Sequence, residues 1–188
     1  YRNLVYGIKL KNIIDALDSE LPDFDSFLAS WIEFLKNQSQ MNQMNQVNVS
    51  ELLREAVFIK GGVPAISEFA RQYAEKYPMA YLDWISALEM EDDKNSVIRV
   101  AREGLSRIPR NYRIRAKVAE IISRIGEKLN DNKLKLEGYR ESFYSNPSIE
   151  YLLDLYLTAI ECDCFEEILN EAEQRVMELR SKSKMPVN

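Results

Sequence analysis

Hydrophobic residues recur at intervals of three and four along most of the chain, a spacing that places them on one face of an α-helix. The first such run contains Leu4, Tyr6, Ile8, Leu10, Ile13, Ile14 and Leu17, and the next contains Phe24, Phe27, Leu28, Trp31, Ile32 and Leu35. Few segments alternate with a period of two, as strands would, and Gly and Pro fall where helices would begin or end. The pattern therefore predicts an all-α chain.

From residue 50 onward the pattern repeats itself. Three segments run for sixteen residues from a small or polar turn to a proline: Gly62 to Pro78, Asp93 to Pro109 and Asp131 to Pro147. The helices that precede them are predicted over residues 50–59, 79–90 and 115–129. A further pair, predicted over 149–160 and 165–179, lacks the closing proline. The chain is thus predicted to consist of successive antiparallel helix pairs.

A helix pair that repeats at about 34 residues and closes with a proline resembles the tetratricopeptide repeat. The resemblance covers about residues 50–180 and implies an α-solenoid, a right-handed superhelix of antiparallel helix pairs. It also implies that the last pair is a cap covering the apolar flank of its neighbour. In the repeat register the second helices cross their partners at Ala101, Gly104, Tyr139 and Phe143, so we expect these residues to lie between paired helices.

The sequence suggests three parts: an N-terminal helix pair over 1–36, an Asn/Gln-rich linker over 37–49, and repeats with a capping pair over 50–188. The linker, which contains NQSQMNQMNQVN, is of low complexity and polar, and we interpret it as a solvated linker or a frayed helix end. An adhesive Asn/Gln segment is the alternative. Because the chain begins at Tyr1 rather than Met, we expect it to be part of a longer polypeptide.

A second resemblance involves residues 136–151, LEGYRESFYSNPSIEY, which follow a helix pair joined by an Asn/Asp turn. This segment is similar to helical regions found downstream of SWIM-type zinc fingers in prokaryotic proteins. The similarity implies an accessory domain of a nucleic-acid-associated parent, although no zinc-finger residues occur in this sequence.

Composition limits where the protein resides. With 46% hydrophobic residues the chain can bury a continuous core. It has no run of about eighteen apolar residues, the length that a membrane-spanning helix requires, and no signal peptide precedes the first amphipathic stretch. Only two cysteines are present, so we expect a reducing, cytoplasmic location without membrane attachment.

Residues that carry chemistry are scarce. Histidine, the most frequent general base and metal ligand, is absent. Cys162 and Cys164 are too close in sequence to close an unstrained disulfide, and no further Cys completes a zinc site. Acidic clusters at 89–93 and Glu166-Glu167 fall at helix N-termini, where carboxylates cap free amides. We therefore predict no enzymatic activity, no cofactor and no metal.

One basic segment departs from the acidic average of the chain. Between residues 99 and 128, nine Lys and Arg minus three Glu give a local charge of +6, against a net charge of −5 for the chain. Arg110, Arg113, Arg115 and Lys117 surround Tyr112, a combination that suits an acidic peptide or a phosphate backbone. Arg115 is expected to point away from the face that Lys117 shares with Arg124. An ordinary solvated surface, neutralised by the acidic residues of 161–178, is the alternative.

The tetratricopeptide resemblance also implies a groove lined by the first helix of each pair. By position in the repeat, its lining is expected to include Glu51, Glu55, Leu82, Ser86, Glu120, Arg124 and Glu127. The partner-binding candidates are therefore Leu82, Ser86, Glu120 and Arg124, together with Arg107, Arg110, Tyr112, Arg113 and Lys117 of the basic segment. The leading hypothesis is a non-catalytic protein–protein interaction scaffold that holds a protein or an acidic peptide. The alternative, an accessory domain that contacts nucleic acid, is disfavoured by the acidic net charge.

Overall fold

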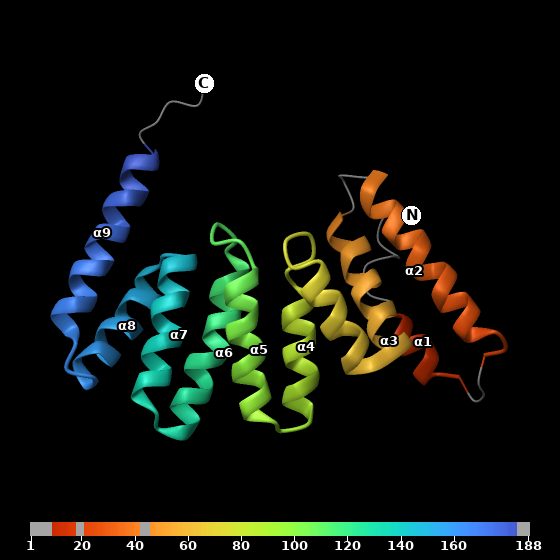
Figure 1. The fold of residues 1–188 in the computed structure, drawn as a ribbon, viewed down its shortest axis with the longest axis horizontal. Coiled ribbons are helices and arrows are strands. Elements are labelled where there is room, and N and C mark those ends of the chain that lie inside the picture. Colours follow the sequence, from red (N-terminus) through yellow and green to blue (C-terminus); the bar gives the residue numbers. More distant parts are fainter. Residues whose placement is uncertain (1–8, 18–20, 42–45, 184–188) are drawn as a thin grey trace. The chain divides into compact units, whose positions relative to one another are not determined.

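The structure, a computed structural model, describes residues 9–17, 21–41 and 46–183. These residues form nine α-helices and no strand, so the prediction of an all-α chain is confirmed (Figure 1). None of the described helices is both long enough and apolar enough to cross a bilayer. The chain divides into two compact units, Tyr1–Ala87 and Leu88–Asn188. The domain limits suggested by the sequence do not coincide with this division and stay a prediction.

The first unit contains α1 (Leu10–Asp15), α2 (Phe24–Met41) and α3 (Gln46–Gln72), and most of α4 (Ala80–Met90). Helix α3 contacts both α1 and α2. Helix α1 is too short to be stable by itself, because the cost of helix nucleation is not recovered in so few residues. The Glu55 carboxylate of α3 accepts hydrogen bonds from the backbone amides of Leu10 and Lys11, each at 3.1 Å, and so caps α1.

Helix α3 changes direction at the predicted Gly61-Gly62 turn. Gly62 has φ 59° and ψ −148°, a conformation that side chains with a Cβ rarely adopt, so a glycine is required here. Pro64 follows, at the beginning of the second segment of α3, where its missing amide costs no hydrogen bond. The two helices that the sequence predicts on either side of the Gly61-Gly62 turn are therefore the two segments of α3.

The polar segment that the sequence assigns to a linker is partly helical. Helix α2 continues to Met41 and α3 begins at Gln46, while residues 42–45 lie outside the described residues. Ser39 is buried, and its hydroxyl forms a 2.6 Å hydrogen bond with the hydroxyl of Tyr77. This polar contact between distant residues gives the end of α2 a packing partner that composition alone does not indicate.

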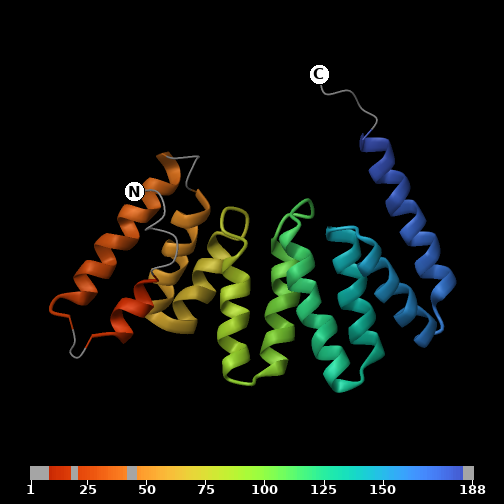
Figure 2. The same ribbon diagram turned by 180° about the vertical axis from the view of Figure 1, so that it is seen from behind.

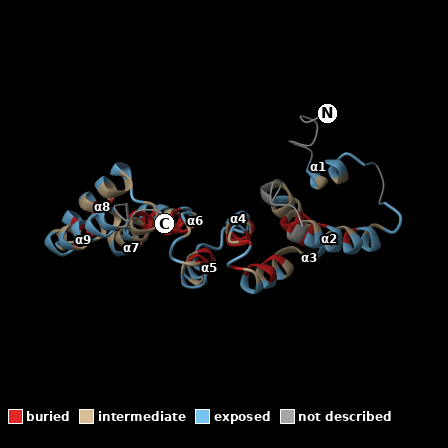
Figure 3. Cartoon of the chain, turned by 90° about the horizontal axis from the view of Figure 1, so that it is seen from above, coloured by how far each residue is buried: buried red, intermediate tan, exposed pale blue. Residues whose placement is uncertain are grey.

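The second unit contains α5 (Lys94–Arg107), α6 (Ile114–Leu129), α7 (Asn132–Ser145), α8 (Ile149–Glu161) and α9 (Phe165–Ser183). Each helix contacts the next one along the chain, and Figures 1 and 2 show the five helices side by side in chain order. In Figure 3, α6 and α8 lie in one row and α5, α7 and α9 in the other. Successive first and second helices thus form two layers of this unit.

Side-chain caps start α5 and α7 at the predicted turns. The carboxylate of Asp93 accepts a hydrogen bond from the amide of Ser96 at 3.0 Å, at the start of α5. Asp131 accepts from the amides of Lys133 and Leu134, both at 3.0 Å, at the start of α7. Helices α5 and α7 each end two residues before a proline, as the repeat of turn and proline predicts.

Helix α6 is the centre of the second unit, since nine of its sixteen residues are buried. The predicted crossing residues Ala101, Gly104 and Phe143 are buried, whereas Tyr139 is half-buried and donates its hydroxyl to Glu127. Helices α6 and α7 approach each other closely at Gly138: a Cβ on this residue would lie 2.3 Å from the amide nitrogen of Ser123. A glycine is thus required for these two helices to pack.

Candidate partner-binding site

Arg115, which the sequence places in the basic segment, is a structural residue. Its side chain is buried, and its guanidinium donates hydrogen bonds to the backbone oxygens of Leu105 and Ile108, the latter at 2.8 Å. The same group forms a 2.9 Å ion pair with Glu141 of α7. Arg115 therefore holds the end of α5 and the α5–α6 connection against α7, and it points away from the exposed face of α6, as the helical spacing predicts.

Other cations of the basic segment are paired with carboxylates. Arg102 donates to both carboxylate oxygens of Glu137, at 2.7 Å and 2.6 Å. Arg107 pairs with Glu103 one turn earlier in the same helix, at 3.4 Å. Arg124 pairs with Glu89. Surface pairs of this kind are worth about 1 kcal/mol or less, but they neutralise charge, so the local excess of +6 overstates what a ligand meets.

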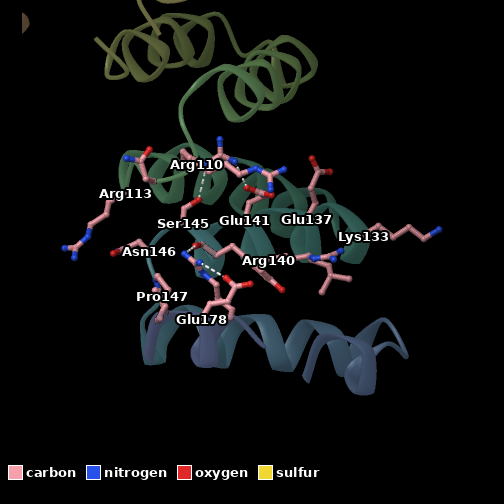
Figure 4. A pocket seen from close by; sticks show the side chains of 16 residues that line it. Arg110, Arg113, Lys133, Glu137, Arg140, Glu141, Ser145, Asn146, Pro147 and Glu178 are labelled. Carbon is pink, nitrogen blue, oxygen red and sulfur yellow. Dashed lines mark hydrogen bonds and ion pairs between the residues drawn. The ribbon is translucent and has the colours of Figure 1, made fainter. Parts of the chain in front are cut away.

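A wide groove lies beside this segment, with a volume of about 1150 Å³. It is bordered by the α5–α6 connection, by one face of α7 and by the C-terminal part of α9 (Figure 4). Its charged lining consists of Arg110, Arg113, Arg115, Lys133, Arg140 and Arg175, against Glu137, Glu141 and Glu178. Six cations and three carboxylates make the groove electropositive although the whole chain is acidic.

The cations of the groove differ in their partners. Arg140 pairs with Glu171, and Arg175 bonds to Glu178 at 3.1 Å and to the backbone oxygen of Tyr144 at 2.8 Å. Within the described residues, Arg110, Arg113 and Lys133 are exposed and form no ion pair. In Figure 4, Arg113 and Lys133 extend outward at opposite ends of the opening. These three cations are therefore available to an anionic ligand.

The buried part of the groove contains an unsatisfied donor. The Nε atom of Arg175 is buried and has no hydrogen-bond partner. A buried guanidinium N–H without an acceptor costs free energy, because its hydrogen bonds to water are lost and not replaced. The same guanidinium forms its other contacts with Glu178 and Tyr144, so α9 and α7 jointly hold it at the groove.

Only some of the residues that the sequence predicts as a partner-binding site lie together in the structure. Arg110 and Arg113 line the groove, and Arg107 lines a neighbouring depression of about 630 Å³ together with Arg110. The other nominated residues do not border the groove: Tyr112, Lys117, Glu120, Arg124, Leu82 and Ser86. Leu82 and Ser86 belong to the first compact unit, and Glu120 accepts a hydrogen bond from the hydroxyl of Tyr151.

Sequence reasoning missed the cations that α7 and α9 contribute. Lys133 and Arg140 are seven residues apart, hence on one face of α7, and Glu137 lies between them on that face. This spacing is visible in the sequence, but the three cations of α7 are nearly balanced by Glu137 and Glu141, so its net charge of +1 does not mark it as a basic segment. Arg175 comes from the acidic segment 161–178, and only the packing of α9 near α7 brings it to the groove.

The two cysteines give a prediction about metal and redox chemistry. Cys162 and Cys164 are free and half-buried, and the described residues contain no group of three metal-ligating side chains. Burial raises the pKa of the Cys164 thiol and so disfavours the thiolate that binds metals. We expect purified protein to carry no stoichiometric metal in elemental analysis and to titrate with two thiols per chain. One zinc per chain, or loss of both thiols without reductant, would contradict this expectation.

Comparison with known proteins provides no relative. The chain matches no model of a protein family, and no curated protein and no solved structure matches it. The resemblance to tetratricopeptide repeats therefore rests on the residue pattern.

Proposed function

We propose that this chain is a non-catalytic binding module of the tetratricopeptide kind, in which helix pairs form a right-handed superhelix, and that its groove binds an acidic segment of another protein. The observation that supports the proposal best is the cationic groove with three exposed, unpaired cations among the described residues, Arg110, Arg113 and Lys133. A peptide carboxylate suits such a site because guanidinium groups bind carboxylates in two-pronged geometry.

The three carboxylates of the groove favour a peptide over a nucleic acid. Glu137, Glu141 and Glu178 belong to the lining together with the cations. A phosphate backbone has only acceptors and negative charge, so these carboxylates would repel it. A peptide offers backbone N–H donors as well as carboxylates, so it can also donate to the remaining lone pairs of these carboxylates, which already pair with Arg102, Arg115 and Arg175. An accessory domain that contacts nucleic acid remains the alternative proposal, and the pairing of Arg102, Arg107 and Arg124 with carboxylates weighs against it.

The test is the binding of a fluorescent peptide of alternating glutamate and alanine, followed by anisotropy at increasing salt. We expect affinity to fall as ionic strength rises toward about 0.15 M, because exposed charges become screened. The double substitution Arg110→Glu and Arg113→Glu should weaken binding by about tenfold or more and leave helicity unchanged, since both side chains are exposed.

A matched control makes the same change of charge elsewhere. Lys117→Glu with Lys128→Glu alters two exposed cations of α6 that do not line the groove, and it should leave affinity nearly unchanged. Equal losses in both double variants would mean that the peptide responds to overall charge and not to the groove. Tighter binding of a single-stranded oligonucleotide of equal charge would favour the nucleic-acid alternative.

A further inference from the structure

Helix α8 carries an exposed apolar stripe that the groove does not use. Ile149, Leu153, Leu157 and Ile160 are 82%, 56%, 54% and 58% exposed, respectively. Their spacing of four, four and three residues places them on one side of the helix. Single exposed leucines are common on protein surfaces, whereas a continuous apolar row indicates an interaction surface. We call these four residues the α8 stripe.

The stripe points away from the core of the second unit. Leu155 and Ala159 of α8 are buried in a cluster with Phe143 of α7 and Ile168 and Ala172 of α9. Residues two apart on a helix point in directions about 200° apart, so Leu153 and Leu157 face opposite to Leu155 and Ala159. A terminal pair that caps a repeat array would have a polar outer face here, and α8 has an apolar one.

Carboxylates border the stripe along one edge. Glu150 and Asp154 lie along one edge of α8, next to Glu161, which pairs with Lys135. The pKa of Asp154 is raised, first by burial and then by the negative charge of Glu127. At the other edge, the ring of Tyr156 packs against Phe165 of α9. The apolar stripe therefore has an anionic edge on one side and an aromatic edge on the other.

We propose that the α8 stripe docks an amphipathic helix of another protein, whose apolar face carries Lys or Arg along the border that meets Glu150 and Asp154. The apolar row supplies the burial that drives association, and the carboxylates select a basic partner. A second copy of this chain is a poorer occupant, because an antiparallel pairing of two α8 helices would bring Glu150 and Asp154 of one copy to those of the other. This surface and the groove would then bind partners of opposite charge.

The experiment uses the full chain and a synthetic helical peptide with leucines at helical spacing and lysines along one border of the leucine row. Calorimetry should detect binding, and Leu153→Ser with Leu157→Ser should weaken it by about tenfold or more. Met90→Ser with Leu129→Ser, two exposed apolar residues outside the stripe, should have little effect. Glu150→Gln with Asp154→Asn should reduce the salt dependence of binding. Because the stripe does not line the groove, Arg110→Glu with Arg113→Glu should leave this peptide's affinity unchanged.

Three results would overturn the proposal. The first is peptide binding that is insensitive to Leu153→Ser with Leu157→Ser. The second is equal affinity for a peptide whose border lysines are replaced by glutamates, since Glu150 and Asp154 would then not distinguish a basic partner from an acidic one. The third is a concentration-dependent dimer in sedimentation velocity that the same two serine substitutions dissociate, since the stripe would then be an interface between copies of this chain.

Discussion

Replacing Gly138 by alanine is expected to lower the free energy of unfolding by about 3 kcal/mol. The added Cβ would lie 2.3 Å from the amide nitrogen of Ser123, 2.7 Å from its Cβ and 2.8 Å from the carbonyl oxygen of Ala119. These are mostly backbone atoms, so α6 and α7 would have to separate. Without such a contact, alanine would instead stabilise the interior of a helix by about 1 kcal/mol relative to glycine. Urea denaturation of the purified chain measures the change.

A loss of stability in Gly138→Ala would indicate close packing of α6 and α7, whereas a gain would indicate that helix propensity dominates. Gln174→Ala, at an exposed position inside α9, is a suitable control and should change stability by less than about 0.5 kcal/mol. If Gly138→Ala proved more stable than the parent chain, the close approach of α6 and α7 at this residue would be wrong.

The substitution Ala101→Asp should destabilise the second unit by about 4 kcal/mol or more. Ala101 is completely buried in α5, beside Val97, Val100 and Gly104, which are buried as well. A carboxylate there would lose its hydration with no cation to pair with. Burial raises the pKa of a carboxyl, so the penalty should be smallest at low pH and should grow as pH rises above the usual carboxyl pKa. Thermal unfolding at several pH values, followed by circular dichroism, measures both effects.

Ala101→Ser separates the effect of charge from that of size, since its hydroxyl can bond to a carbonyl one turn earlier. We expect a loss of about 1 kcal/mol with no dependence on pH. If Ala101→Asp and Ala101→Ser proved equally stable, residue 101 would be in contact with solvent. The same conclusion would follow if the unfolding temperature of Ala101→Asp did not respond to pH.

Local features of the fold could be predicted from the sequence because short-range chemistry determines them. The caps at Asp93 and Asp131, and the glycine that allows the bend at Gly62, follow from the conformations that these side chains favour. The burial of Ala101 and Phe143 follows from their positions in helices of known register. Each of these conclusions depends on residues within about one or two helical turns.

The groove could be predicted only in part, since it assembles residues that are far apart in the chain. Arg110 and Arg113 were found because the local charge is high, whereas Arg140 and Arg175 come from segments where acidic residues conceal them. A count of charges also treats Arg115 as a surface cation, although it is buried and bonded to backbone carbonyls. Sequence reveals how much charge a segment has, but the pairing of that charge depends on tertiary packing.

The anchoring of Arg115 has a consequence for the entropy of binding. Its bonds to the carbonyls of Leu105 and Ile108 and to Glu141 fix the α5–α6 connection, which carries Arg110 and Arg113, against α7 before any ligand arrives. The backbone of this border of the groove is thus preorganised, and an incoming peptide has only to restrict the side chains of those two arginines. On the protein side, the entropic cost of binding is then about 0.5–1.5 kcal/mol for each of these two side chains. The rest of the entropic cost comes from ordering the flexible peptide.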